Sequence, residues 1–301
     1  MFYKSRTECD ELTILRSLNT RMNLPEKDKQ HFFNLKKGYE GELQFDCMTE
    51  KLQSECYVLN DLLLNVNNTI FQIDSLIIFP ESIHFFEVKN YEGDYYYESD
   101  RMYKKSKVEI NNPLTQLTRS ESLLRQLLQT LGYKYSLNAS VVFINPDFYL
   151  YQALLNKPFI FPTQINKYLK KLDACTAKLD RKHQLLADKL VSLHIHESPY
   201  SQLPTYDYEQ LQKGITCDKC GSFSISVKGK KCVCAGCGHE ELVDDALMRS
   251  VSEFKMLFPD RKIMTNVVYD WCRVVESKKR ISRILGKNFT KIGTKRWVYF
   301  E

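Results

Sequence analysis

The feature that most constrains the fold of this chain is a pair of apolar segments at residues 70–89, IFQIDSLIIFPESIHFFEVK. The first segment contains Asp74 and the second contains Glu87. Two apolar runs on either side of a Pro-Glu dipeptide predict an antiparallel hairpin. A turn at that dipeptide pairs residues whose numbers sum to 161, which places Asp74 opposite Glu87. Directly opposed residues have Cβ atoms about 4.5–5.5 Å apart, and Lys89 projects from the same face as Glu87. A bulge at the turn would shift this register by one residue.

The two opposed carboxylates need positive charge between them. They repel each other, and burying them without a partner is costly. A divalent cation fits this requirement, because Mg²⁺ prefers one or two carboxylates and keeps water or phosphate in its remaining positions. Lys89 beside that metal would hold the attacking water and lower its pKa. A structural ion pair between Lys89 and Glu87 or Asp74 is the alternative interpretation.

Two further motifs lie on either side of this hairpin in the sequence. In GYEGE, Gly38 and Gly41 are three residues apart on an expected helix, and Glu42 follows directly. Missing side chains allow a backbone or a phosphate to come close, at a cost of about 1 kcal/mol each in helix propensity. Downstream, an Asn-Pro dipeptide starts a second helix, from which Gln116 can reach back with its amide. Either motif alone also fits simple packing or a surface position.

Taken together, these motifs resemble a known family. GYEGE, FQIDSLII, FFEVKNYEG and NPLTQ occur in the order and approximate spacing of the nuclease-related domain, NERD, a branch of the PD-(D/E)xK nuclease superfamily. The resemblance covers roughly residues 35–150 and implies a restriction-endonuclease-like mixed sheet flanked by helices. The sequence departs from the superfamily pattern at two positions. Ile73 precedes Asp74, so the Pro-Asp dipeptide of the superfamily name is absent. Ser120 occupies the tyrosine position of the Gln-x-x-x-Tyr signature that some relatives have.

The resemblance also implies roles for individual residues. Asp74, Glu87 and Lys89 would form the D…ExK core, with the two acids holding Mg²⁺ or Mn²⁺. Glu42 would be the additional helical acid and a further ligand of the metal. Gln116 would occupy a late motif position at the same catalytic site.

The order of elements predicts an α/β fold. A helix is expected at 37–52, and strand-like runs follow at 57–66, 70–79, 83–89 and 94–97. The run at 94–97 has a partner strand expected near residues 102 and 103. A second helix at 113–131 and a strand at 139–145 come next. Such an order is typical of a mixed sheet covered by helices. Five parts are predicted: a helical arm at 1–34 with a polar linker at 23–30, a NERD-like domain at 35–150, a helical connector and linker at 151–210, a zinc ribbon at 211–245, and a basic module at 246–301.

Five of the ten cysteines fall within 21 residues, and four of these five form two CxxCG knuckles separated by 13 residues. Each knuckle can wrap two thiolates around one zinc ion, with the glycine freeing the tight turn. The predicted ligands of this structural Zn²⁺ are Cys217, Cys220, Cys234 and Cys237. Cys232 in place of Cys234 is an alternative, and His239 is a further one. This spacing is typical of a metal site in a reducing compartment, not of a disulfide framework.

Positive charge is concentrated at the end of the chain. Residues 246–301 carry 13 Lys and Arg against 5 Asp and Glu, a net of +8, whereas the rest of the chain has a net of −2. A basic terminal segment indicates an anionic polymer as partner, usually nucleic acid. Two helices at 263–272 and 278–285, the second capped by Ser277, and a basic aromatic end loosely resemble a winged-helix module. The residues expected to bind nucleic acid are Lys279, Arg280, Arg283, Lys295 and Arg296. A small helical subdomain with a solvated basic face is the alternative.

Composition excludes several classes of protein. With 43% apolar and 27% charged residues, the chain is neither disordered nor of low complexity. No run approaches the roughly 18 apolar residues of a membrane span, and residues 1–21 have no signal-peptide core, so a cytoplasmic protein is expected. The main interpretation is a metal-dependent nuclease that hydrolyses phosphodiester bonds in DNA. A non-catalytic nucleic-acid-binding or processing scaffold with a vestigial site stays open, as does a structural partner protein.

Overall fold

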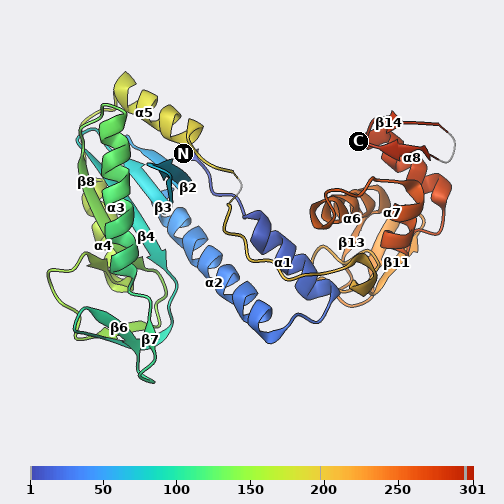
Figure 1. Cartoon of the computed structure of the whole chain (residues 1–301), viewed down its shortest axis with the longest axis horizontal. Helices are drawn as coiled ribbons and strands as arrows, with labels where there is room; N and C mark the ends of the chain where they lie inside the picture. Colours follow the sequence, from blue (N-terminus) through green and yellow to red (C-terminus); the bar gives the residue numbers. More distant parts are fainter. Residues whose placement is uncertain (1, 197, 295–296) are drawn as a thin grey trace. The chain divides into compact units, whose positions relative to one another are not determined.

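The structure, a computed structural model, describes residues 2–196, 198–294 and 297–301. The chain divides into two compact units (Figure 1). The first unit contains Met1–Cys9 and Phe33–Ser201, and the second contains Asp10–Phe32 and Gln202–Glu301. The chain therefore contributes two segments to each unit. The five-part division expected from the sequence stays a prediction.

A six-stranded mixed sheet forms the centre of the first unit. Its order is β1(Phe2–Lys4), β2(Tyr57–Val66), β3(Thr69–Ile78), β4(Ser82–Lys89), β8(Ser136–Phe143) and β10(Phe159–Ile160). The pairs β2–β3 and β3–β4 are antiparallel, whereas β1–β2, β4–β8 and β8–β10 are parallel. The structure therefore confirms the expected α/β fold with a mixed sheet.

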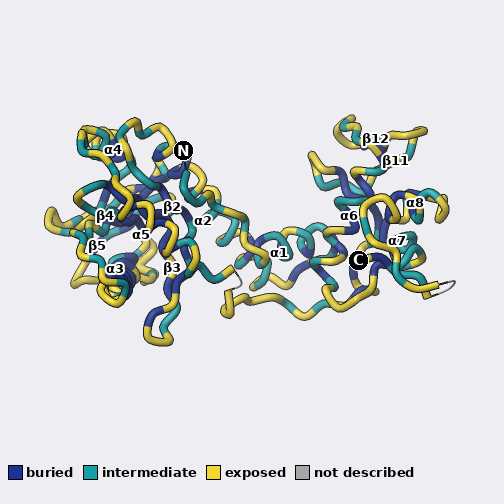
Figure 2. The backbone as a smooth tube through the Cα atoms, turned by 90° about the horizontal axis from the view of Figure 1, so that it is seen from above, coloured by how far each residue is buried: buried dark blue, intermediate teal, exposed yellow. Residues whose placement is uncertain are grey.

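Helices cover both faces of this sheet. Helices α3(Pro113–Thr130) and α5(Arg181–Ser192) contribute to one apolar core, and α2(Glu26–Thr49) and α4(Pro162–Leu172) contribute to another. Neighbouring strand residues alternate between the two cores, since Phe85 lies in the first and Phe86 in the second. Strand β3 is buried along most of its length for this reason (Figure 2). A charged residue in β3 or β4 therefore lies in an apolar setting.

Helix α2 begins earlier than the sequence predicted. The polar stretch at 23–30 was expected to be a linker, but α2 starts at Glu26 and continues to Thr49. Glu26 and Asp28 lie in the first turn, where negative charge stabilises the helix N-terminus. The expectation of a linker was wrong because charged residues are good helix formers as well as common linker residues.

A smaller sheet completes the first unit. Its order is β7(Glu109–Ile110), β6(Arg101–Lys104), β5(Gly93–Glu98) and β9(Phe148–Tyr151). Tyr97 pairs with Met102 and Tyr96 with Tyr103, so the predicted pairing of this hairpin is confirmed.

The second unit is built from short elements around its own core. They are α1(Asp10–Arg21), the 3-10 turn η1(Tyr208–Gln210), a sheet of β11(Ile225–Lys228), β12(Lys231–Cys234) and β13(Glu240–Leu242), helices α6(Val243–Leu257), α7(Thr265–Cys272) and α8(Lys278–Asn288), and the pair β14(Lys291–Ile292) and β15(Tyr299–Phe300). The predicted succession of two helices and a terminal hairpin is confirmed. Leu18 and Leu24 pack into this core with Phe254 and Trp271, so the segment before Phe32 is part of the packed unit.

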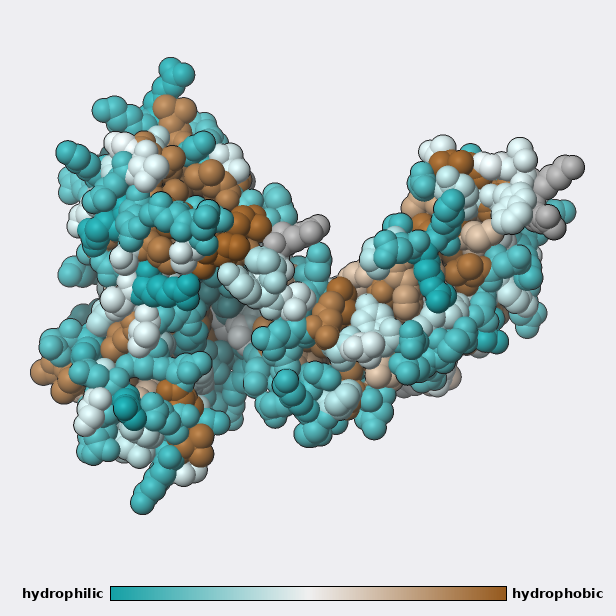
Figure 3. Space-filling model, viewed as in Figure 1, coloured by the Kyte–Doolittle hydropathy of each residue, from teal (hydrophilic) through white to brown (hydrophobic). Residues whose placement is uncertain are grey.

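The surface is predominantly polar. On the face shown in Figure 3, hydrophilic side chains dominate and apolar side chains form separate patches, in keeping with a mean hydropathy of −0.39. Within the described part of the chain, no helix is both long and apolar enough to cross a membrane.

The two glycines of GYEGE have different surroundings in α2. A Cβ atom on Gly41 would lie 2.5 Å from Asn90 Cβ and 3.1 Å from Ile144 Cγ2, whereas a Cβ on Gly38 would have no heavy atom within 4 Å. A close approach therefore exists at Gly41, but the Asn90 side chain makes it, and not the backbone or phosphate that was expected. Asn90 donates a hydrogen bond to the Lys37 carbonyl oxygen, which fixes it in this position.

Gly41→Ala should destabilise the protein by about 1–3 kcal/mol, because the added methyl group forces Asn90 and the backbone apart. Gly38→Ala is the matched control on the same helix, and it should stabilise the protein by up to about 1 kcal/mol through helix propensity. Urea unfolding of the two variants measures the difference. Equal effects of both substitutions would contradict the proposed role of the Asn90 contact.

Candidate active site and metal centre

The predicted hairpin has the predicted register. Strands β3 and β4 pair Ser75 with Phe86 and Ile78 with Ile83, so the numbers of paired residues sum to 161. The paired segment ends at Ser75 and Phe86, so Asp74 and Glu87 directly follow its last pair, and their direct opposition stays a prediction. The chain folds locally in this way because apolar residues on both strands fill the two cores on either side of the sheet.

The residues of the hairpin are buried and in contact. Asp74 is 5% exposed and Glu87 is 2% exposed. Asp74 Oδ2 accepts a hydrogen bond of 2.7 Å from the Val88 backbone N–H, and Glu87 Oε1 lies 2.5 Å from Lys89 Nζ. The ion pair considered as the alternative interpretation is therefore present.

Helix α3 brings Gln116 to the same place. Lys89 Nζ donates a hydrogen bond of 3.2 Å to Gln116 Oε1. Strand alternation puts Glu87 and Lys89 on the side of Phe85, which shares a core with α3. Asn112 caps this helix by accepting from the Leu114 N–H, which fixes the first turn that carries Gln116.

Glu42 is held by a residue that the sequence analysis did not single out. Arg6 Nη1 donates to Glu42 Oε2 at 2.6 Å, and Arg6 Nη2 donates to the Asp74 carbonyl oxygen at 2.6 Å. Arg6 also donates to both carboxylate oxygens of Asp46, at 2.9 and 3.2 Å. The spacing of Glu42 and Asp46 by one helical turn is a signal that could have revealed the second acid. No sequence pattern indicates Arg6, because it is 36 residues from Glu42.

Burial dominates the electrostatics of these acids. Desolvation, followed by the charge of Asp74, raises the pKa of Glu42 and of Glu87 to about 8. Desolvation also raises the pKa of Asp74, although Lys89 and the Val88 N–H act against it. Desolvation works to lower the pKa of Lys89, but Glu87 and Asp74 overcome it and raise that pKa. Lys89 is therefore a cation in a site that disfavours further negative charge.

The donor set suits a hard divalent cation. Asp74 and Glu87 offer carboxylate oxygens on neighbouring strands, and their raised pKa values mean that added positive charge would stabilise the ionised forms. The acids are not clustered as closely as metal-bound ligands usually are. Among described residues, only the four cysteines of the knuckles form a group of three or more potential ligands within 4.8 Å of one another.

Residues 37–144 match the family model of the nuclease-related domain. This segment of the chain is a NERD domain. No curated protein and no solved structure matched the chain. The match covers α2 from Lys37, the β3–β4 hairpin and α3, so it contains Glu42, Asp74, Glu87, Lys89 and Gln116. The match suggests a nuclease-related function for this segment, and the individual catalytic roles stay predictions.

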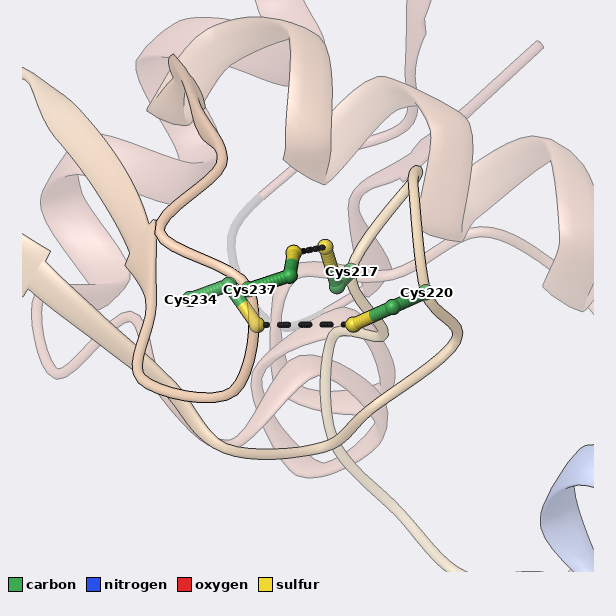
Figure 4. A group of neighbouring side chains, drawn as sticks. All are labelled: Cys217, Cys220, Cys234 and Cys237. Carbon is green, nitrogen blue, oxygen red and sulfur yellow. Dashed lines mark hydrogen bonds between the residues drawn. The ribbon is translucent and has the colours of Figure 1, made fainter.

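A second candidate centre lies outside the NERD domain, in the zinc-ribbon segment of the second unit. The two knuckles bring four sulfur atoms together (Figure 4), with Cys217 and Cys237 Sγ 3.6 Å apart and Cys220 and Cys234 Sγ also 3.6 Å apart. Gly221 and Gly238 have φ values of +72° and +71°, so each knuckle needs glycine at its turn. The ligand atoms of all four cysteines lie within 4.8 Å of one another, an arrangement compatible with a zinc ribbon.

The two alternative zinc ligands, Cys232 and His239, lie outside the group of four cysteines. Cys232 is 1% exposed on β12 and packs into the core of the second unit, outside the group of four. His239 is also outside this group, and its carbonyl oxygen accepts from the Cys234 N–H.

We expect one zinc ion per chain, and Cys234→Ser should abolish stoichiometric zinc binding because only three thiolates remain. Cys232→Ala should lose packing in the core but keep the zinc. Elemental analysis of the purified variants measures the metal, and thermal unfolding with a chelator measures its contribution to the stability of the second unit. If Cys232→Ala loses zinc and Cys234→Ser keeps it, Cys232 and not Cys234 is the zinc ligand.

The basic residues predicted to bind nucleic acid are not equivalent. Lys279 and Arg283 are exposed on α8, whereas Arg280 is partly buried and donates to the Gly229 carbonyl oxygen at 2.9 Å. Arg280 thus ties α8 to the turn between β11 and β12. Ser277 caps α8 by accepting from the Arg280 N–H, as predicted. Lys295 and Arg296 lie outside the described residues.

Proposed function

We propose that the chain is a metal-dependent nuclease that hydrolyses phosphodiester bonds in DNA processing. The observation that carries this proposal is the convergence of Asp74, Glu87, Lys89 and Gln116 within a NERD domain. Asp74 and Glu87 would hold Mg²⁺ or Mn²⁺, and Glu42, which forms an ion pair with Arg6, would lie next to the ion without ligating it. When bound, the divalent ion would polarise the scissile phosphate and stabilise the negative charge that develops on it.

The chain's own residues have defined tasks in this proposal. Lys89 is a cation, so it does not accept a proton from water. Its ammonium group would donate to the attacking water or the phosphate and would stabilise negative charge on either. Gln116 accepts from Lys89 and so fixes the direction of the ammonium group. The apolar strands around the hairpin keep these groups in a setting of low dielectric constant, where such interactions are strong.

Lys89→Ala should lower the cleavage rate by about 10²–10³-fold while the protein stays folded, because Glu87 can take up a proton when its partner is removed. Lys105→Ala is a control, since Lys105 forms an exposed ion pair with Asp94. Labelled single- and double-stranded DNA and RNA, incubated with Mg²⁺, Mn²⁺ or chelator, report the activity. Thermal unfolding checks the fold.

The same experiment tests a second candidate function. The Lys89–Glu87 and Arg6–Glu42 ion pairs favour a non-catalytic scaffold, because each partly neutralises a carboxylate without a metal. A scaffold would bind nucleic acid and cleave none of these substrates with either metal ion. Full activity of Lys89→Ala would rule out the proposed mechanism.

The second unit would supply affinity for DNA. In α8, Lys279 and Arg283 present positive charge to solvent. The predicted contribution of Lys295 and Arg296 falls outside the described residues. We also propose the cytoplasm as the location, because free thiolates for zinc require a reducing compartment.

Replacing Lys279 and Arg283 by alanine should weaken DNA binding and flatten its salt dependence. The log–log slope should fall by about 0.9 for every phosphate of duplex DNA that the protein no longer neutralises. Charge substitutions are preferable to truncation after Asp245, which would remove the core residues Phe254 and Trp271.

A double variant at two other exposed lysines, Lys170 and Lys171 on α4, is the matched control. Fluorescence anisotropy across a salt series, with chelator present, measures binding without cleavage. If the α8 variant keeps the slope and affinity of the unchanged protein, α8 is an ordinary solvated surface.

A further inference from the structure

The guanidinium group of Arg6 is enclosed by acceptors from two elements. It contacts the carboxylates of Glu42 and Asp46 on α2 and the backbone carbonyl of Asp74 on β3, at distances between 2.6 and 3.2 Å. Its side chain is 2% exposed, compared with 20% for Glu42 and 7% for Asp46. A buried guanidinium group with this many charged partners is a fixed part of the site.

The N-terminal strand places Arg6 there. Strand β1 pairs in parallel with β2, where Phe2 is opposite Val58. Lys4 Nζ donates to the carbonyl oxygens of Asn60 and Asp61 at 2.8 and 2.7 Å. These contacts hold the backbone just before Arg6, so its position does not depend on a substrate.

Arg6 divides the acids of the site into two groups. Glu42 and Asp46 face the guanidinium group, whereas the side chains of Asp74 and Glu87 make no hydrogen bond to it. Without Arg6, two largely buried carboxylates one helical turn apart would repel each other next to Asp74. Two such carboxylates are also a suitable pair of ligands for a divalent cation.

We propose that Arg6 takes the place of a second metal ion, so that the site binds a single divalent cation through Asp74 and Glu87. This inference rests on the proposed nuclease function. It makes Arg6 a positioning residue, because the guanidinium group holds Glu42 and Asp46 and neutralises charge that would otherwise recruit a metal.

The test counts bound metal ions and does not depend on cleavage. The full-length, zinc-loaded protein is titrated with Mn²⁺, and the stoichiometry is measured by calorimetry and by electron paramagnetic resonance of free Mn²⁺. The unchanged protein should bind one Mn²⁺. Arg6→Ala should bind two, and Arg6→Lys should bind one because it keeps the charge.

Two further variants separate charge from structure. The double variant Arg6→Ala, Glu42→Gln should return to one ion, because it no longer has the second pair of carboxylates. Arg101→Ala is the control variant, because Arg101 is an exposed arginine paired with Glu109. It should bind one ion, like the unchanged protein. Thermal unfolding identifies any variant that does not fold.

The outcomes distinguish this inference from the function on which it rests. Two ions in the unchanged protein would overturn the role of Arg6 while supporting a metal-dependent site, and this result needs no variant. A single ion in folded Arg6→Ala would also overturn it. No Mn²⁺ bound to the unchanged protein would contradict the metal-dependent nuclease itself.

Discussion

The stability of the first unit depends on the positive charges that compensate the buried carboxylates of an apolar hairpin. Asp74 and Glu87 are nearly inaccessible, and such carboxylates destabilise a fold unless positive charge is nearby. Lys89 provides this charge from the same strand, and Arg6 provides it from the N-terminal segment. Strand β1 lies beside β2 at the edge of the sheet, and from this position the chain brings Arg6 to α2 and β3.

The second unit uses a buried arginine in a similar way. Arg21 is 2% exposed and binds the Glu253 carboxylate and the Gln212 carbonyl oxygen, while its guanidinium group lies 4.0 Å from the Trp271 ring centroid. This one side chain joins α1, α6 and α7 across the core. Removing it would leave Glu253 without its partner, which is costly for a charge that is largely buried.

The two candidate metal centres differ in chemistry. Carboxylate oxygens in the NERD domain suit Mg²⁺ or Mn²⁺, whereas the four thiolates of the zinc-ribbon segment suit zinc. Four cysteines fill the tetrahedral coordination of zinc and leave no position for substrate, which fits a structural role. Arg249 ties this segment to α6 by donating to the Thr216 carbonyl oxygen and to Glu241, so the stability of the knuckles and of the helical core should be linked.

The sequence by itself determined the local features of this protein. Alternating apolar residues and the Pro-Glu turn determined the register of the hairpin that carries Asp74 and Glu87, and the CxxCG spacing selected four cysteines, because both depend on residues close in the chain. The family motifs indicated the NERD segment, which the family model matches at residues 37–144. Only the tertiary structure decided that Arg6 compensates the acids together with Lys89, and which glycine is required. Arg6 reaches Glu42 and Asp74 across 36 and 68 residues, and Gly41 is needed because Asn90 packs against it from another strand end. Contacts of this kind arise from packing between distant segments, so no local pattern of residues encodes them.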